Sequence, residues 1–189
     1  MSTGPFEKYE PLAGKRVRVP SRGVRRIPHL ATLLGARSVG RVGPFDAVVG
    51  WGSKPRTKRA IALAAKRGVP YVTLEDGFVR SIRPGVLGGS PLAMVFDDVG
   101  IYYDVTRPSR LESWIAAGDL STAERARSRD LIATLRRTGL SKYNHQPDLD
   151  LGPKTRPRVL VVDQTAGDQS IRFGTPSTDF AGMLAAAAH

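Results

Sequence analysis

A strand–helix–strand pattern between residues 47 and 74 constrains the fold of this chain more than any other feature. Residues 47–51 (AVVGW) and 69–74 (VPYVTL) have the apolar, β-branched composition of buried strands. Between them, residues 56–67 carry apolar side chains at helical spacing, and Gly68 supplies the stop. A strand, a helix and a second strand of these lengths require a right-handed crossover and parallel pairing. The sequence therefore predicts an α/β fold, a Rossmann-like parallel sheet with flanking helices on both faces.

Capping and turn signals place the other elements. Ser109 and Ser121 are each followed three residues later by Glu, the capping-box pattern. They predict helices over 110–117 and 122–138, which end at Gly118 and Gly139. Further predicted elements are short helices near 27–34 and 178–188, short strands at 93–96 and 101–103, and a buried parallel strand at 158–162.

The composition excludes several kinds of structure and site. The chain has 189 residues, enough for one domain with a sizeable core, and no window with the 18 or more apolar residues of a spanning helix. It contains no cysteine, which excludes disulfides, thiolate zinc sites and a cysteine nucleophile. The three histidines are far apart in sequence and do not favour a histidine metal site. We expect no metal.

The charge is strongly positive and uneven. The formal net charge is +12, and residues 1–60 hold 13 basic and three acidic residues. A basic face suits nucleic acid, an anionic phospholipid surface or a nucleotide sugar, whereas arginine used only for solubility explains the same numbers. No nucleic-acid-binding motif is present and aromatic residues are few, so we expect no nucleic acid partner.

Carboxylates follow two of the predicted strands. Asp163 and Asp168 lie in a small, polar loop after residues 158–162, and Glu75 and Asp76 follow residues 69–74. Ligands bind at the carboxyl ends of parallel strands, so these groups are candidates for nucleophile, base or orienting group. The alternatives are structural: a capped turn at Asp163–Ser170, and ion pairs from Glu75 and Asp76 to Arg80 and Arg83.

Three other groups of residues are weaker candidates. Gly52, Ser53 and Lys54 follow a strand and could present donors to a phosphate, although no known phosphate-loop spacing is present. Asp97-Asp98 could hold a divalent cation, but a hairpin turn between the two short strands is preferred. Lys142 and Asn144 lie at a helix end, where they bind ligand or satisfy the backbone of the linker.

Six segments, in this order, resemble those of the capsular polysaccharide β-Kdo transferase family, also known as capsule polysaccharide biosynthesis or export proteins. They are GWGSKP (50–55), LEDGFVRS (74–81), DDVGIYYD (97–104), TRPSRLE (106–112), LSKYN (140–144) and VVDQTAGD (161–168). The similarity runs from about residue 27 to the end of the chain.

The resemblance implies retaining transfer of Kdo from CMP-Kdo to a phosphatidylglycerol-type glycolipid, at the cytoplasmic side of the inner membrane. It implies the first lobe of a GT-B-like glycosyltransferase, no cofactor besides the donor substrate, and capsule assembly or export proteins as partners. Asp168 matches the nucleophile, with Gln164 as its neighbour, and Glu75 and Asp76 match a motif at the same cleft. Expected substrate-binding residues are Gly52, Lys54, Arg80, Ser81, Lys142, Asn144 and Ser170.

The sequence and the resemblance together predict three parts of the chain. Residues 1–26 are expected to form a basic irregular arm, residues 27–157 the Rossmann-like lobe, and residues 158–189 the start of a further strand-loop-helix segment. An uncapped final helix suggests that the sequence is the front part of a longer protein, inactive alone because the CMP-binding residues lie elsewhere. The alternative function is a non-enzymatic module for polysaccharide export or assembly at the inner membrane.

Overall fold

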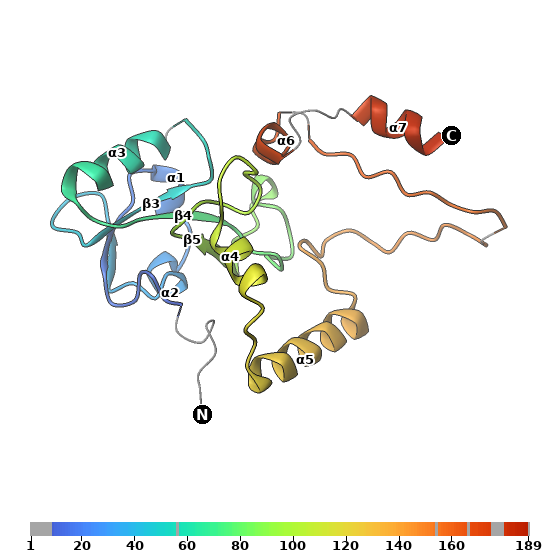
Figure 1. Cartoon of the computed structure of the whole chain (residues 1–189), viewed down its shortest axis with the longest axis horizontal. Helices are drawn as coiled ribbons and strands as arrows, with labels where there is room; N and C mark the ends of the chain where they lie inside the picture. Colours follow the sequence, from blue (N-terminus) through green and yellow to red (C-terminus); the bar gives the residue numbers. More distant parts are fainter. Residues whose placement is uncertain (1–8, 56, 154, 166, 175–179, 189) are drawn as a thin grey trace.

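The computed structural model describes residues 9–55, 57–153, 155–165, 167–174 and 180–188. Its strands are β1 (Arg16–Arg18), β2 (Ser38–Gly40), β3 (Ala47–Trp51), β4 (Tyr71–Asp76) and β5 (Met94–Asp97). Its helices are α1 (Arg22–Arg25), α2 (Leu30–Leu33), α3 (Thr57–Arg67), α4 (Arg110–Ala117), α5 (Thr122–Thr138), α6 (Gln169–Gly174) and α7 (Phe180–Ala188), with a 3-10 turn, η1 (Gly85–Leu87). Figure 1 shows the sheet at one end of the molecule and α5, α6 and α7 outside it.

The sheet has the order β2-β1-β3-β4-β5. Strands β1, β2, β3 and β4 pair in parallel, and α3 connects β3 to β4. This confirms the predicted strand–helix–strand unit and the α/β fold. The parallel strands all end at one edge of the sheet, which is where their loops bring polar side chains together.

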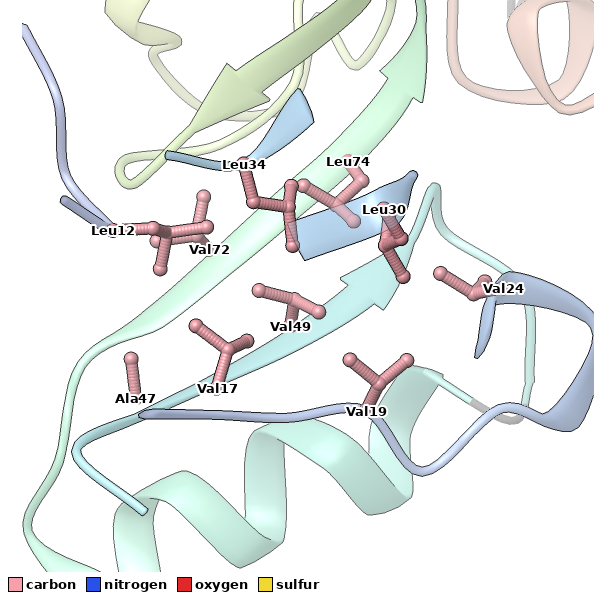
Figure 2. Packing of buried hydrophobic residues seen from close by; sticks show 10 residues of the cluster. All are labelled: Leu12, Val17, Val19, Val24, Leu30, Leu34, Ala47, Val49, Val72 and Leu74. Carbon is pink, nitrogen blue, oxygen red and sulfur yellow. The ribbon is translucent and has the colours of Figure 1, made fainter. Parts of the chain in front are cut away.

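Both faces of the sheet are covered, as the apolar runs predict. Val48 packs against Ala60 and Ala64 of α3. Its neighbour Val49 faces the opposite side and joins a cluster with Leu30 and other residues around α1 and α2 (Figure 2). Successive side chains of a strand point to opposite faces, so a strand buried on both sides needs the continuous apolar sequence that β3 has.

The amino-terminal segment is not an irregular arm over its described residues. Residues 16–18 form β1, which lies between β2 and β3 in the sheet, and residues 22–25 form α1. The alternation Arg16-Val17-Arg18-Val19 is a strand pattern, and the side chains of Val17 and Val19 are buried in the core. The sequence analysis missed this strand because the segment is rich in arginine. The expectation for residues 1–8 lies outside the described residues.

The predicted hairpin around Asp97-Asp98 is wrong. Strand β5 pairs antiparallel with β4, and residues 101–103 form a turn instead of a second strand. Asp97 is buried, and its carboxylate accepts hydrogen bonds from the backbone N–H groups of Val99, Gly100 and Arg110. A turn therefore follows Asp97, as preferred over a cation site, but the chain continues from it to α4 and not to a second strand.

Residues 158–162 do not form the predicted buried strand. They have no regular secondary structure, and Leu160 is 86% exposed. A strand is stable only when a neighbour satisfies its backbone groups, and the described residues provide no strand for this segment to pair with. Asp168 therefore does not follow a strand. It precedes α6, a helix that the sequence analysis did not predict, whereas α7 lies within the predicted range 178–188, of which 178–179 are outside the described residues.

Helices α4 and α5 begin and end as the sequence predicts. Both capping boxes are present, and Gly118 and Gly139 end the helices with left-handed backbone. None of the helices among the described residues has the length and apolar content needed to cross a membrane.

The two caps differ in burial, which leads to a prediction. The hydroxyl of Ser109 is fully buried and exchanges hydrogen bonds with the backbone N–H and the carboxylate of Glu112. We expect Ser109→Ala to lower the free energy of unfolding by about 2 kcal/mol, because it removes a buried hydroxyl together with its two hydrogen bonds to Glu112. Ser121→Ala, at a cap that is partly exposed, should cost about 1 kcal/mol or less. Urea denaturation of both variants measures the difference, and equal losses would contradict it.

Candidate functional site

Polar loops leave the carboxyl ends of β3 and β4 side by side. Gly52 directly follows β3, with φ of 52°, and its backbone N–H donates to the carbonyl of Leu74 in β4. A Cβ on Gly52 would lie 2.7 Å from the Tyr103 hydroxyl and 2.9 Å from Oε2 of Glu75. Any larger residue would therefore collide with the carboxylate of Glu75. This explains why glycine stands here, and it places the Gly52-Ser53-Lys54 loop against Glu75.

Glu75 is held between this loop and the turn after β5. The Tyr103 hydroxyl accepts a hydrogen bond from the backbone N–H of Ser53 at 3.1 Å, and it donates one to Oε2 of Glu75 at 3.5 Å. Burial raises the pKa of Glu75 above its ordinary value, while Lys142 and Lys54 act in the opposite direction. Glu75 has no ion pair with Arg80 or Arg83 among the described residues, so the structural alternative does not apply to it.

Asp168 is exposed at the start of α6. Its Oδ1 accepts hydrogen bonds from the backbone N–H and the hydroxyl of Ser170, both at 2.8 Å. These bonds lower the pKa of Asp168, and the positive charges of Lys142 and Lys54 lower it further. The carboxylate is thus ionised at neutral pH. Ser170 fixes the orientation of Asp168, and its expected contact with substrate stays a prediction.

Helix α6 is fastened to the same edge of the sheet. The carbonyl of Phe173 accepts from the backbone N–H of Val105 at 3.1 Å, in the turn region after β5 (Figure 1). Phe173 also lines a small pocket, about 160 Å³, together with Gly52 and Lys54. The helix thereby carries Asp168 to the β3–α3 loop although no strand precedes it.

Glu75 and Asp168 share one electrostatic environment. Lys54 and Lys142 lie close enough to influence the pKa of both carboxyl groups. Burial raises the pKa of Tyr102 to about 12, and the charges of Glu75 and Asp168 both contribute. The geometry agrees: Gly52, which lies against Glu75, and Phe173 of α6, the helix that Asp168 precedes, line the same small pocket as Lys54. Tyr102 and Tyr103 were not among the predicted site residues, although both lie in the DDVGIYYD segment.

Asp76 has a different environment from Glu75. Its Oδ1 forms an ion pair with Nε of Arg80 at 2.5 Å, and its Oδ2 is 3.4 Å from the Tyr143 hydroxyl. This pairing is the structural alternative given by the sequence analysis. A catalytic role of Asp76 stays a prediction.

Most of the remaining predicted substrate-binding residues have internal partners. Arg80 donates to the hydroxyl of Ser81 and to the carbonyl of Gly89, and the Ser81 hydroxyl donates to the carbonyl of Arg83. Asn144 donates to the carbonyl of Ser141. Other bonds join the loop after β4 to residues 141–144: the Asn144 amide also donates to the carbonyl of Ser81, and the backbone N–H groups of Arg80 and Ser81 donate to the carbonyl of Lys142.

Gln164 and the pair Asp97-Asp98 have contacts separate from those of Glu75 and Asp168. The backbone N–H of Gln164 donates to Oδ1 of Asp163, and its exposed side chain has no hydrogen bond among the described residues. Asp98 forms a two-pronged ion pair with Arg110 and accepts from the Tyr9 hydroxyl. Within the described residues, no three acidic or histidine side chains gather in a way that could hold a metal ion.

Comparisons with known proteins give a consistent result. Residues 46–151 match the family described as "Capsule polysaccharide biosynthesis protein". The chain is 46% identical over 167 residues to the capsule polysaccharide modification protein LipA of Neisseria meningitidis, from serogroup A and from serogroup B, and 38% identical over 136 residues to the lipopolysaccharide-processing protein LpsZ of Rhizobium meliloti. These matches cover 85% and 68% of this chain but only 24% and 30% of the relatives, so the chain spans about a quarter of the length of LipA.

Two solved structures from Thermosulfurimonas dismutans are also similar. The β-Kdo 2,4 transferase of KpsC superposes with a TM-score of 0.80 at 37% identity, over 91% of this chain and 56% of that one. The β-Kdo 2,7 transferase of KpsC superposes with a TM-score of 0.56 at 26% identity, over 86% and 53%. The fold described above is therefore shared with solved Kdo transferases.

Proposed function

The chain belongs to the capsule polysaccharide biosynthesis protein family, and on that premise we propose that it forms the carboxylate-bearing lobe of a retaining Kdo transferase with a GT-B-like arrangement. The observation that carries the proposal is that Gly52, packed against Glu75, and Phe173 of α6, the helix that Asp168 precedes, line one pocket with Lys54. The charges of Lys54 and Lys142 also act on both carboxyl groups. A second supporting observation is the similarity to the β-Kdo 2,4 transferase, which extends over nearly the whole chain.

In the proposed reaction, Asp168 is the nucleophile. Its carboxylate oxygen attacks the anomeric carbon of Kdo as the bond from that carbon to the CMP phosphate breaks, and CMP leaves with the electron pair. The acceptor hydroxyl then attacks the same carbon, its proton passes to a base, and the bond to Asp168 breaks. Two displacements retain the configuration. A nucleophile needs an ionised carboxylate, and the hydrogen bonds from Ser170 keep Asp168 in that form.

Glu75 is the proposed base. Burial raises its pKa, which makes its carboxylate a better proton acceptor than an exposed one. Lys54 and Lys142 are suited to the carboxylate of Kdo and the phosphate of CMP, both of which are anionic. No cofactor is required. CMP itself is proposed to bind residues outside this sequence, which is consistent with the quarter of the relatives' length that the chain spans. We therefore expect no transfer by the 189-residue chain alone.

We further propose that the protein works at the anionic surface of the inner membrane, on a phosphatidylglycerol-type acceptor and beside capsule assembly or export proteins. The net charge of +12 supports this. The loop after β4 also supports it, because its exposed side chains include Ile82, Val86, Leu87 and Leu92, while the charged side chain of Arg80 is turned inward.

A pH profile tests the role of Glu75, in a protein of family length that contains this sequence and transfers Kdo. Since a base must be deprotonated, the rate should fall as the pH drops through the raised pKa of Glu75. We expect Glu75→Gln to lower kcat about 100-fold or more and to remove this acidic limb. Asp76→Asn, which removes the adjacent carboxylate, should keep the limb. An unchanged acidic limb in Glu75→Gln would eliminate Glu75 as the base. Normal capsule assembly by a variant that no longer transfers Kdo would favour the non-enzymatic alternative.

A further inference from the structure

A pocket of about 510 Å³ opens at the carboxyl ends of β1 and β3. It lies between residues 20–23, which follow β1, and the loop from Trp51 to Thr57, which follows β3. The connection from β1 leads to β2 on one side, whereas the connection from β3 leads to β4 on the other, so the two loops diverge. Such a point, where the order of a parallel sheet reverses, is where open α/β sheets hold ligands. None of the predicted site residues except Lys54 lines this pocket.

The wall of the pocket is basic. Arg22, Lys54 and Arg59 line it, and no acidic residue is among its described lining residues. None of these three side chains has a hydrogen bond or ion pair with another described residue. Three positive charges that have no hydrogen bond or ion pair among the described residues and surround one concave space favour the binding of an anion there.

Neighbouring arginines behave differently. Arg16 forms an ion pair with Asp46, Arg18 donates to the carbonyls of Arg41 and Gly43, and Arg25 donates to the carbonyls of Val19 and Pro20. Several arginine side chains of this region thus have internal partners, whereas Arg26 and Arg41, which lie outside the pocket, have no side-chain hydrogen bond or ion pair among the described residues. What distinguishes Arg22 and Arg59 is their position, because both line one concave pocket together with Lys54.

Lys54 connects this pocket to the carboxylate site. Lys54 and Thr57 line both this pocket and the small pocket that Gly52 and Phe173 line, and Gly52 lies against the carboxylate of Glu75. A ligand in the pocket would therefore lie next to the two carboxylates. The volume suits one sugar-sized group, with the indole of Trp51 as an apolar wall.

We infer that this pocket binds the anionic end of the acceptor, a sugar carboxylate or a glycerol phosphate, through Arg22, Arg59 and Lys54. The identity of the ligand as an acceptor rests on the proposed function, whereas the existence of an anion site rests on the pocket alone. Carboxylate and phosphate both accept two parallel hydrogen bonds from a guanidinium group, so the shared chemistry is that of an oxyanion.

Fluorescence of Trp51 tests the inference in the full 189-residue chain. Trp114→Phe removes the second tryptophan, and the chain is titrated with the methyl glycoside of Kdo, with glycerol 3-phosphate and with neutral methyl galactoside. We expect saturable changes with one or both anions and none with methyl galactoside. The double variant Arg22→Gln/Arg59→Gln should bind the anions at least about tenfold more weakly. The control Arg26→Gln/Lys66→Gln removes the same charge from exposed positions outside the pocket and should change binding less than about twofold.

The outcomes separate the two proposals. Binding of the Kdo glycoside alone assigns the pocket to an acid sugar, and binding of glycerol phosphate alone assigns it to a lipid headgroup. No anion binding, equal binding of methyl galactoside, or an equal loss in the control variant would overturn the inference. Because the titration needs no CMP-Kdo, anion binding without any Kdo transfer by a longer protein would contradict the proposed function while leaving the pocket intact.

Discussion

Asp168→Asn should reduce Kdo transfer at least about 1,000-fold in a protein of family length that contains this sequence. The substitution removes the negative charge that forms the bond to the anomeric carbon, and a neutral amide cannot replace it. It keeps a side-chain oxygen at the start of α6, which can still accept the hydrogen bonds from Ser170. The fold should therefore be preserved, and the same loss is expected for Asp168→Ala. Initial rates with CMP-Kdo, together with circular dichroism, measure both effects.

Asp163→Asn is the matched control for this prediction. Asp163 is also exposed, lies five residues earlier, and likewise accepts a hydrogen bond from a backbone N–H, that of Gln164. It has no role in the proposed reaction, so transfer should change less than about threefold. A rate near that of the unmodified protein in Asp168→Asn would remove the assignment of the nucleophile.

Arg80→Ala should be the most destabilising of the substitutions considered, at about 3–5 kcal/mol. The guanidinium group of Arg80 is nearly buried, pairs with Asp76 and donates to the carbonyl of Gly89 across the loop. Removing it leaves a partly buried carboxylate and a carbonyl without their partner. The loop from residue 81 to 92 should open at the same time, because Arg80 connects its two ends. Chemical denaturation measures the stability, and limited proteolysis measures the opening of the loop.

Arg83→Ala tests whether this effect depends on burial. Arg83 lies in the same loop, but its side chain is exposed and has no partner among the described residues. The free energy of unfolding should change by about 0.5 kcal/mol or less. If Arg80→Ala and Arg83→Ala have the same small effect, the buried ion pair does not hold the loop.

Local patterns predict the parts of this fold that local forces decide. The strand–helix–strand unit around α3 and the two capped helices were predicted, because apolar periodicity, Ser–Glu caps and glycine stops act within a few residues. Strand β1 was missed despite its alternating valines, since its place beside β3 is a contact between distant segments. The opposite error occurred at residues 158–162, where a strand sequence exists without a neighbouring strand among the described residues.

Sequence alone treated Glu75 and Asp76 as a pair, and tertiary contacts separate them. Consecutive residues of a strand point to opposite sides, so Glu75 faces Tyr103 and Gly52 while Asp76 faces Arg80. The cations of the pocket, Arg22 and Arg59, were not recognisable in the sequence. Many arginines are present, and only the structure distinguishes those with internal partners from those without.

What the sequence determined by itself is the class of fold and the limits of α4 and α5, and it supplied the candidate carboxylates Glu75, Asp76 and Asp168. These features depend on the type of side chain and on the spacing between residues that are close in the sequence. Only the tertiary structure decided that Asp168 reaches the edge of the sheet on a helix, that it shares Lys54 and Lys142 with Glu75, and that a basic pocket adjoins them. The physical reason is that electrostatic fields and cavities arise from segments distant in sequence, and their geometry exists only once the sheet has formed.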